Sequence, residues 1–546
     1  MPEMQDSPKL NVRLPLIFGA VLAVGMFVGT KLPVYDRQFA RLDNVSKFSG
    51  TGTLEELIGY IDARYVDSAN TEALRERAIT EFLKGLDPHS VYISKDEIAG
   101  VREEMEGQFD GIGIEFLIVD DTLQVVTPLS GGPSEAAGIL AGDRVVTIND
   151  TLIAGIKLDN ALIYKKLRGR KGTPVKVGIR RGREASLRVF DIKRDAIPIH
   201  SVDVAYLLDP QTVYVKINKF SATTTKEFYE KTKPFFNNNI PLDLVLDLRG
   251  NPGGYLEQAT ELLSNFFPEQ KLLVYTEGRM DKREDYKSTG RQFFRLKNLA
   301  VLIDEGSASA AEIVAGAVQD HDRGWLVGRR SFGKGLVQEE YPLHDGGAVR
   351  LTIARYFTPS GRCIQKDYVH DREHYKDDFQ KRVDSGELTD GSKVKIADST
   401  AFFTAKGRKV YAGGGIIPDV FVPLDTSFAN DYYFDVRANI LAQFAQKLIE
   451  NQQVTNHENL VGFVKNWHAS PQLLDDLVAY SEKNGIKKNP AQFARCKNEL
   501  ALQLKARLAK LLFKEEGLFT VLNDDDPCIE KALSVLKKGE PTGGKN

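Results

Sequence analysis

Hydrophobic residues change their spacing several times along the chain, and each change indicates a different kind of structure. Leu54, Leu57 and Ile58 recur as on one face of a helix. A second run with the same spacing ends before Pro88, which cannot continue a helix. The pattern therefore predicts a helical region over residues 53–106.

Residues 107–195 have a different pattern, in which short runs rich in β-branched residues are separated by Gly and Asp turns. Two such runs begin at Leu123 and Val175. A single helical stretch over 158–167 interrupts the predicted strands. We expect a small β domain with one prominent helix.

Residues 196–424 alternate apolar strands with helices, which predicts an α/β core. Within it, residues 366–400 are charged and are interpreted as a surface insertion. Residues 425–546 show amphipathic helical spacing and predict a C-terminal helical region. The chain as a whole is predicted to be a multidomain α/β protein.

The N-terminus contains seventeen uncharged residues, Leu14 to Thr30, preceded by Lys9 and Arg13. This length is enough for one membrane span, and the basic flank places the N-terminus in the cytoplasm. We expect a cytoplasmic tip and anchor over 1–31 and a polar linker over 32–52. A cleaved signal peptide is the alternative, but residues 28–31 form a poor cleavage site.

Composition narrows the classes of partner and cofactor. The 546 residues carry a formal net charge of −2 and no long basic run, so no nucleic-acid partner is indicated. The three cysteines, Cys363, Cys496 and Cys528, are far apart and contain no C-x-x-C pair, so neither a zinc site nor a disulfide framework is expected. One Cys496–Cys528 disulfide stays an open alternative. No metal or cofactor is expected.

Ser309 follows a predicted buried strand and opens a predicted helix, where backbone N–H groups favour developing negative charge. The alternative is that a serine here only caps the helix. The G-x-S-x-G pattern is missing. His321 lies at the far end of the same helix, roughly 15–18 Å away, and is a poor base for Ser309. His89 is interpreted as structural.

Lys334 is the other candidate base, because a buried amine without a carboxylate partner loses its proton more readily. Gly333 and Gly335 flank it and allow close backbone approach. Gln338, four residues on, returns to the same face of a helix or strand and could orient the amine. The alternative is a solvated turn lysine.

A second turn, residues 247–254, also follows a predicted strand and is rich in glycine. Its backbone N–H groups, from Gly253 or Gly254, could stabilise an oxyanion together with that of Ala310. The alternative is an ordinary strand-to-helix turn.

Together these motifs resemble the carboxy-terminal processing proteases, also called tail-specific proteases (peptidase family S41), over roughly residues 53–424. The resemblance implies that Ser309 is the catalytic serine, that Lys334 is its lysine 25 residues on, and that Gln338 is a supporting glutamine. It also implies an acidic residue near the site at Asp320. The matching segments are 86–90, 247–254, 306–313, 332–335, 356–361 and 413–419.

The same resemblance implies a PDZ domain over 107–195. Its carboxylate loop would be Gly111, Ile112, Gly113 and Ile114, whose N–H groups could hold the terminal carboxylate of a peptide added as a strand.

The expected protein is a serine endopeptidase of the inner bacterial membrane, single-pass, with its catalytic part in the periplasm. Its expected partners are protein substrates with apolar C-terminal tails, and a homo-oligomer stays open. One alternative is a membrane-anchored PDZ adaptor with an inactive protease-like core. Another is an α/β hydrolase acting on small esters.

Overall fold

A computed structural model describes most of the chain and divides it into two compact units, residues 1–78 and 79–546. The predicted tip, anchor and linker lie outside the described residues, apart from Gly52. Within the described part of the chain, no helix has the length and hydropathy needed to cross a bilayer. The described residues are 52–542 except 130, 183, 185, 237–239, 370–374, 397 and 455–458.

The helical spacing at the start of the chain corresponds to real helices. Helix α2 (Thr53–Arg64) buries Ile58, and α3 (Thr71–Lys84) buries Leu83. Helix α4 (Ile98–Glu106) completes the region. The structure differs from the prediction at β1 (Val91–Ile93), which pairs antiparallel with β18 of the α/β region.

The predicted β domain is confirmed as a sheet in the order β3-β4-β5-β7-β8, with β6 on β5 and one long helix, α6. Strand β3 is an edge of this sheet. A separate ribbon joins β2 to β9. The elements are β2 (Gln108–Gly111), β3 (Ile114–Val119), β4 (Thr122–Pro128), α5 (Pro133–Ala136), β5 (Arg144–Ile148), β6 (Thr151–Leu152), α6 (Asn160–Leu167), β7 (Pro174–Arg180), β8 (Arg188–Lys193) and β9 (Asp195–Pro198).

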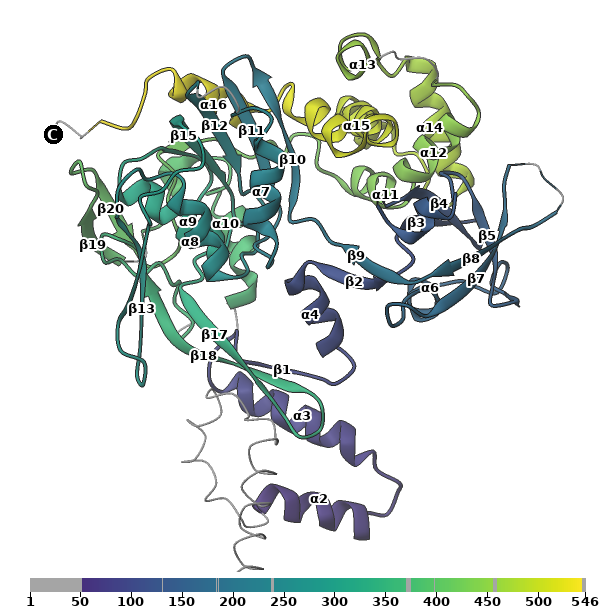
Figure 1. The fold of residues 1–546 in the computed structure, drawn as a ribbon, viewed down its shortest axis with the longest axis horizontal. Helices are drawn as coiled ribbons and strands as arrows, with labels where there is room; N and C mark the ends of the chain where they lie inside the picture. The colour runs from purple at the N-terminus through teal and green to yellow at the C-terminus, as the bar shows by residue number, and fades with distance from the viewer. Residues whose placement is uncertain are drawn as a thin grey trace, which may run out of the picture. The chain divides into compact units, whose positions relative to one another are not determined.

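The α/β core is built on a sheet in the order β10-β11-β12-β15-β16-β21. Figure 1 labels four of these strands, β10, β11, β12 and β15. All neighbours in this sheet are parallel except β10 and β11. The elements are β10 (Val202–Asp209), β11 (Thr212–Ile217), α7 (Thr224–Thr232), β12 (Leu242–Asp247), α8 (Leu256–Ser264), β15 (Leu296–Ile303), α9 (Ala310–Asp320), β16 (Trp325–Gly328) and β21 (Val420–Phe421).

Both faces of this sheet are buried, because successive strand residues point to opposite sides. In β12, Leu244 and Leu246 pack into the cluster that includes the apolar residues of α7, α8 and α9. Val245 packs instead with residues of α16 (Pro527–Leu536) on the other face. The C-terminal helix is therefore part of the α/β core.

A second sheet was not predicted. Its order is β1-β18-β13-β14, with β17 also on β18. This sheet continues from the loop that contains Lys334, because β17 begins directly after that loop. The elements are β13 (Leu272–Gly278), β14 (Glu284–Lys287), β17 (Leu336–Pro342) and β18 (Ala348–Phe357).

Residues 366–400 are not simply a surface insertion, which corrects that interpretation. Arg382 is buried and donates hydrogen bonds to the carbonyls of Arg330 and Ser331, just before the Lys334 loop. The insertion thus braces that loop. Its elements, with the ribbon that follows, are η2 (Tyr375–Asp377), α10 (Asp378–Asp384), η3 (Gly391–Lys393), β19 (Asp398–Phe403) and β20 (Lys409–Ala412).

The helical prediction for the C-terminal region is confirmed. Five of its helices form their own apolar cluster, while α16 packs on the core sheet. Cys496 and Cys528 fall in these two separate clusters, and both are free thiols, as is Cys363. The remaining helices are α11 (Asp431–Asn439), α12 (Leu441–Glu450), α13 (Leu460–Asn466), α14 (Pro471–Lys483) and α15 (Pro490–Asn523).

Candidate active site

Two turns at neighbouring strand ends form the centre of the candidate site. Strands β12 and β15 are parallel and adjacent, so the turns that follow them emerge at the same edge of the sheet. The Ala308 N–H donates to the Asn251 carbonyl across 2.9 Å and joins the two turns. Ser309 and the glycines of the 250–254 turn are thereby brought together.

Ser309 itself has a strained backbone. Its φ is 53° and its ψ is −115°, a region that residues other than glycine rarely occupy. The residue precedes α9, whose residues are buried throughout. Strain of this kind persists only where the surroundings enforce it, and it occurs often at reactive residues.

Gly253 lies directly against Ser309. A Cβ at this position would be 2.7 Å from the Ser309 Cβ and 2.9 Å from the Ala310 nitrogen, so only glycine fits. The Gly253 N–H, however, donates to Asn251 Oδ1 at 2.8 Å and is not free in this conformation. The N–H groups of Ala310 and Gly254 have no acceptor among the described residues, which leaves these two as candidate oxyanion donors.

Glu312 connects the serine and lysine segments, a role that the sequence analysis did not assign. Its Oε2 accepts the backbone N–H groups of Ser309 at 2.9 Å and Lys334 at 2.8 Å. Its Oε1 accepts the Gly333 N–H at 2.7 Å and the Ser331 hydroxyl. Burial raises the pKa of the Glu312 carboxyl, against the opposing effect of these donors. One carboxylate thus fixes both segments.

Tyr356 makes a second connection between the same segments. Its hydroxyl lies 3.2 Å from the Ser309 carbonyl oxygen and 2.6 Å from the Lys334 carbonyl oxygen. The ring is buried at the end of β18. The segment containing Tyr356 was recognised in the sequence, but its function as a bridge depends on a long-range contact.

Lys334 has the environment expected of a base. Burial, followed by the positive charge of Arg350, lowers the pKa of its amine to about 8, although Glu312 and Asp87 oppose the shift. Among the described residues no carboxylate forms an ion pair with Lys334, so nothing there fixes it as a cation. A useful fraction of the amine is therefore neutral near pH 7.

Gln338 lies on β17 and leads to the segment at 86–90. Its amide nitrogen, Nε2, is 3.5 Å from the Thr352 hydroxyl on β18, and that hydroxyl donates to Asp87 at 3.0 Å. Asp87 also accepts the backbone N–H groups of His89 and Ser90. The predicted supporting glutamine is thus held by a network that reaches the N-terminal part of the catalytic unit.

His89 is placed close to the Lys334 loop. Its ring contacts the Phe332 ring edge-on at 6.5 Å, and its Nε2 is 2.8 Å from the Tyr375 hydroxyl. Burial, with the positive charge of Lys334, lowers the pKa of His89 to about 4. The His89 imidazole is therefore neutral at pH 7 and adds no positive charge beside Lys334.

Asp320 does not lie at the site, which corrects its expected supporting role. It ends α9, eleven residues after Ser309 and about 16 Å along the helix at 1.5 Å per residue. Its carboxylate pairs with the buried Arg362 at 2.7 Å and accepts the Ser360 N–H at 3.0 Å. His321, the next residue, is equally distant, as the sequence indicated.

The predicted carboxylate loop leads into a sheet edge. The carbonyls of Ile112 and Gly113 accept hydrogen bonds from Ser134 and Leu129. Gly113 has a φ of 72° and introduces β3, the edge strand. On β3, the Phe116 ring meets the Tyr164 ring of α6 at 5.8 Å, so the helix borders this edge.

Comparison with known proteins decides the family. Residues 211–374 match peptidase family S41, residues 111–190 match the PDZ domain, and residues 432–514 match a family of unknown function (DUF8443). The chain is 35% identical over 349 residues to the carboxy-terminal-processing protease of Bartonella bacilliformis, covering 62% of this chain and 78% of that protein. The chain belongs to the carboxy-terminal processing proteases of peptidase family S41.

The chain is also similar to other known proteins. The chain is 34% identical to the carboxy-terminal processing protease CtpB of Bacillus subtilis, over 57% of this chain and 65% of that one. Among solved structures, the photosystem II D1 C-terminal processing protease is 26% identical, with a TM-score of 0.34 over 68% of this chain and 85% of that one.

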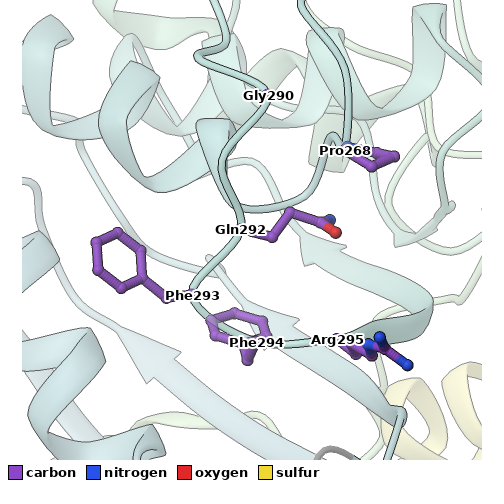
Figure 2. Close-up of a pocket in the computed structure, with 6 residues that line it drawn as sticks. All are labelled: Pro268, Gly290, Gln292, Phe293, Phe294 and Arg295. Carbon is purple, nitrogen blue, oxygen red and sulfur yellow. The ribbon is translucent and has the colours of Figure 1, made fainter.

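One cavity of this S41 chain lies away from Ser309 and Lys334. A cavity of about 340 Å³ is lined by Pro268, Gly290, Gln292, Phe293, Phe294 and Arg295, and contains neither Ser309 nor Lys334 (Figure 2). Figure 2 shows the Phe293 ring directed away from the Gln292 amide. Within the described residues, no cluster of His, Cys, Asp and Glu could hold a metal ion.

Proposed function

We propose that this S41 protease is an endopeptidase that cleaves protein substrates with Ser309 as nucleophile and Lys334 as general base. Membership of the family supports serine-type peptidase chemistry. The assignment of these two residues depends on one observation. A single oxygen of the Glu312 carboxylate, Oε2, accepts the backbone N–H groups of both Ser309 and Lys334. Two segments fixed by one atom keep a constant separation.

In the proposed reaction, neutral Lys334 takes the proton of the Ser309 hydroxyl, whose oxygen attacks the scissile carbonyl carbon. The Ala310 and Gly254 N–H groups stabilise the oxyanion. Lys334 then donates its proton to the leaving amine as the C–N bond breaks. A water molecule hydrolyses the acyl-enzyme by the same proton transfers. Gln338 supports the amine as a neutral amide.

We further propose that the PDZ domain captures the substrate's C-terminus. The free edge of β3 suits strand addition, and the loop 111–114 precedes it. Substrate with an amidated C-terminus is expected to show a KM at least several-fold above that of the same chain with a free carboxylate. Equal KM values would contradict carboxylate capture.

Membrane attachment and export rest on the sequence alone. We propose that residues 14–30 anchor the chain, with the catalytic unit in the periplasm. Protease shaving of spheroplasts would digest a periplasmic catalytic unit and spare a cytoplasmic one. The homo-oligomer stays a prediction that sedimentation of the full-length chain would test.

The decisive experiment compares full-length wild type with Ser309→Ala and Lys334→Ala on an unstructured protein with an apolar C-terminal tail. Ser392→Ala and Lys393→Ala, two exposed positions, are the matched controls. We expect the controls to cut at the wild-type rate and both site variants to be inactive while folded. Full activity of Lys334→Ala would refute the assigned base.

An adaptor with an inactive core is the competing function. An active-site serine probe separates the two, because labelling that disappears in Ser309→Ala requires an activated serine. Wild type that neither labels nor cuts, yet still binds apolar tails, would favour the adaptor.

A further inference from the structure

The guanidinium of Arg249 joins the turn at residues 247–254, called the oxyanion turn below, to the C-terminal helix α16. Its Nη1 is 2.6 Å from Asp526 Oδ2, at the start of α16. Its Nη2 and Nε contact Asp247, the last residue of β12, at 2.6 Å and 3.0 Å. Asp526 lies far outside residues 211–374, which match the S41 family.

Four charges meet here and balance. Arg249 and Lys216 are the cations, and Asp247 and Asp526 are the carboxylates. Their side chains are 21%, 12%, 2% and 16% exposed, in that order. Removing the charge of Asp526 would leave one positive charge uncompensated in a mostly buried cluster, an arrangement that drives neighbouring groups to move.

The position of Arg249 is important because the turn begins there. Its carbonyl accepts a hydrogen bond from Lys216, and the next N–H, that of Gly250, donates to Asp304 at 2.7 Å. Gly250 has a φ of 67°, and the chain then passes through Asn251 to the glycine beside Ser309. A shift of Arg249 would therefore act on the start of the turn that leads to the candidate oxyanion donors.

Asp526 is itself held firmly. Its Oδ1 caps α16 by accepting the Cys528 N–H at 2.7 Å, while Oδ2 faces Arg249. Ile529 and Val535 of α16 are buried against the core sheet. Beyond the helix, the Trp325 indole N–H donates to the Gly539 carbonyl at 2.7 Å. These contacts hold the Asp526 carboxylate in one place.

We propose that Asp526 is a positioning residue for proteolysis, so that the C-terminal helix completes the active site by fixing Arg249 and the oxyanion turn. The inference rests on the proposed serine protease function and deepens it. It assigns to α16 a catalytic contribution separate from its packing.

The test is Asp526→Asn in the full-length chain. Asparagine caps a helix as well as aspartate does, so the variant removes the charge and keeps the cap. We expect kcat to fall about tenfold with KM unchanged, since sub-ångström displacement of reacting groups has effects of this order. Glu530→Gln, an exposed carboxylate on the same helix, is the control and should keep both constants.

A double-mutant cycle shows whether the effect passes through Arg249. In an Arg249→Gln background, Asp526→Asn should cost little further activity, because the partner is already gone. Independent, multiplying losses would overturn the inference, as would an Asp526→Asn enzyme with wild-type kcat. If wild type cuts nothing and no serine probe labels it, the proposed function fails first, and this inference fails with it.

Discussion

The two ends of helix α9 each carry a buried carboxylate, but the two carboxylates have different partners. Glu312, in the first turn, accepts backbone N–H groups from the serine and lysine segments. Asp320, in the last turn, pairs with the guanidinium of Arg362. One end holds the backbone of the proposed nucleophile and base in place, and the other attaches the segment after β18 to the helix.

The difference shows that burial and charge alone do not locate an active site. Both carboxylates are almost fully buried, and both are hydrogen-bonded. What separates them is the segment that each one fixes. Glu312 fixes backbone within one residue of the proposed nucleophile and base, whereas Asp320 fixes Ser360 and Arg362. Mutating each should therefore change a different property.

Asp320→Asn should have the largest effect, and it should be on stability. Removing one partner of a buried ion pair costs about 3–5 kcal/mol, because Arg362 is left charged and unpaired. Urea denaturation would show the loss, while kcat per folded molecule stays near that of wild type. A collapse of kcat in the folded variant would mean that this end of α9 also serves the chemistry.

Glu312→Gln should act on catalysis. The amide has one oxygen where the carboxylate has two, so one pair of donors loses its acceptor. Misplacement of Ser309 or Lys334 should reduce kcat/KM about 100-fold, which corresponds to a barrier about 2.7 kcal/mol higher. The variant should also unfold about 1–3 kcal/mol more easily. Retained activity would show that Tyr356 alone is enough to fix the two segments.

The alternation of strands and helices in the core could be predicted because strands such as β15 and β16 are largely apolar runs between turns. The sequence did not predict β17 and β18, whose residues are half-buried and mixed in polarity. The contact of Thr352 with Asp87 spans 265 positions and leaves no local signal. The wrong placement of Asp320 near the site could have been avoided. The distance along the helix that separates His321 from Ser309 applies equally to Asp320.

The pH dependence of kcat/KM tests whether Lys334 is the base for Ser309, the residue that precedes α9. If Lys334, with its pKa of about 8, is the base and acts as a neutral amine, kcat/KM should rise about tenfold per pH unit below that value and level off above it. His89, whose pKa is about 4, would give a rise centred there instead. A profile that is flat between about pH 6 and 8 would contradict the lysine assignment.

Arg350→Gln should give the smallest effect and the sharpest test of electrostatic tuning. The charge of Arg350 on β18 is the second cause, after burial, that lowers the pKa of Lys334. Without it the amine should hold its proton to higher pH, the rising limb should move to alkaline pH, and activity at pH 7 should fall a few-fold, with recovery near pH 9. Arg355→Gln, an exposed arginine on the same strand, should leave the limb in place. If both variants shift the limb equally, general surface charge sets the pKa of Lys334; if neither does, burial alone accounts for it.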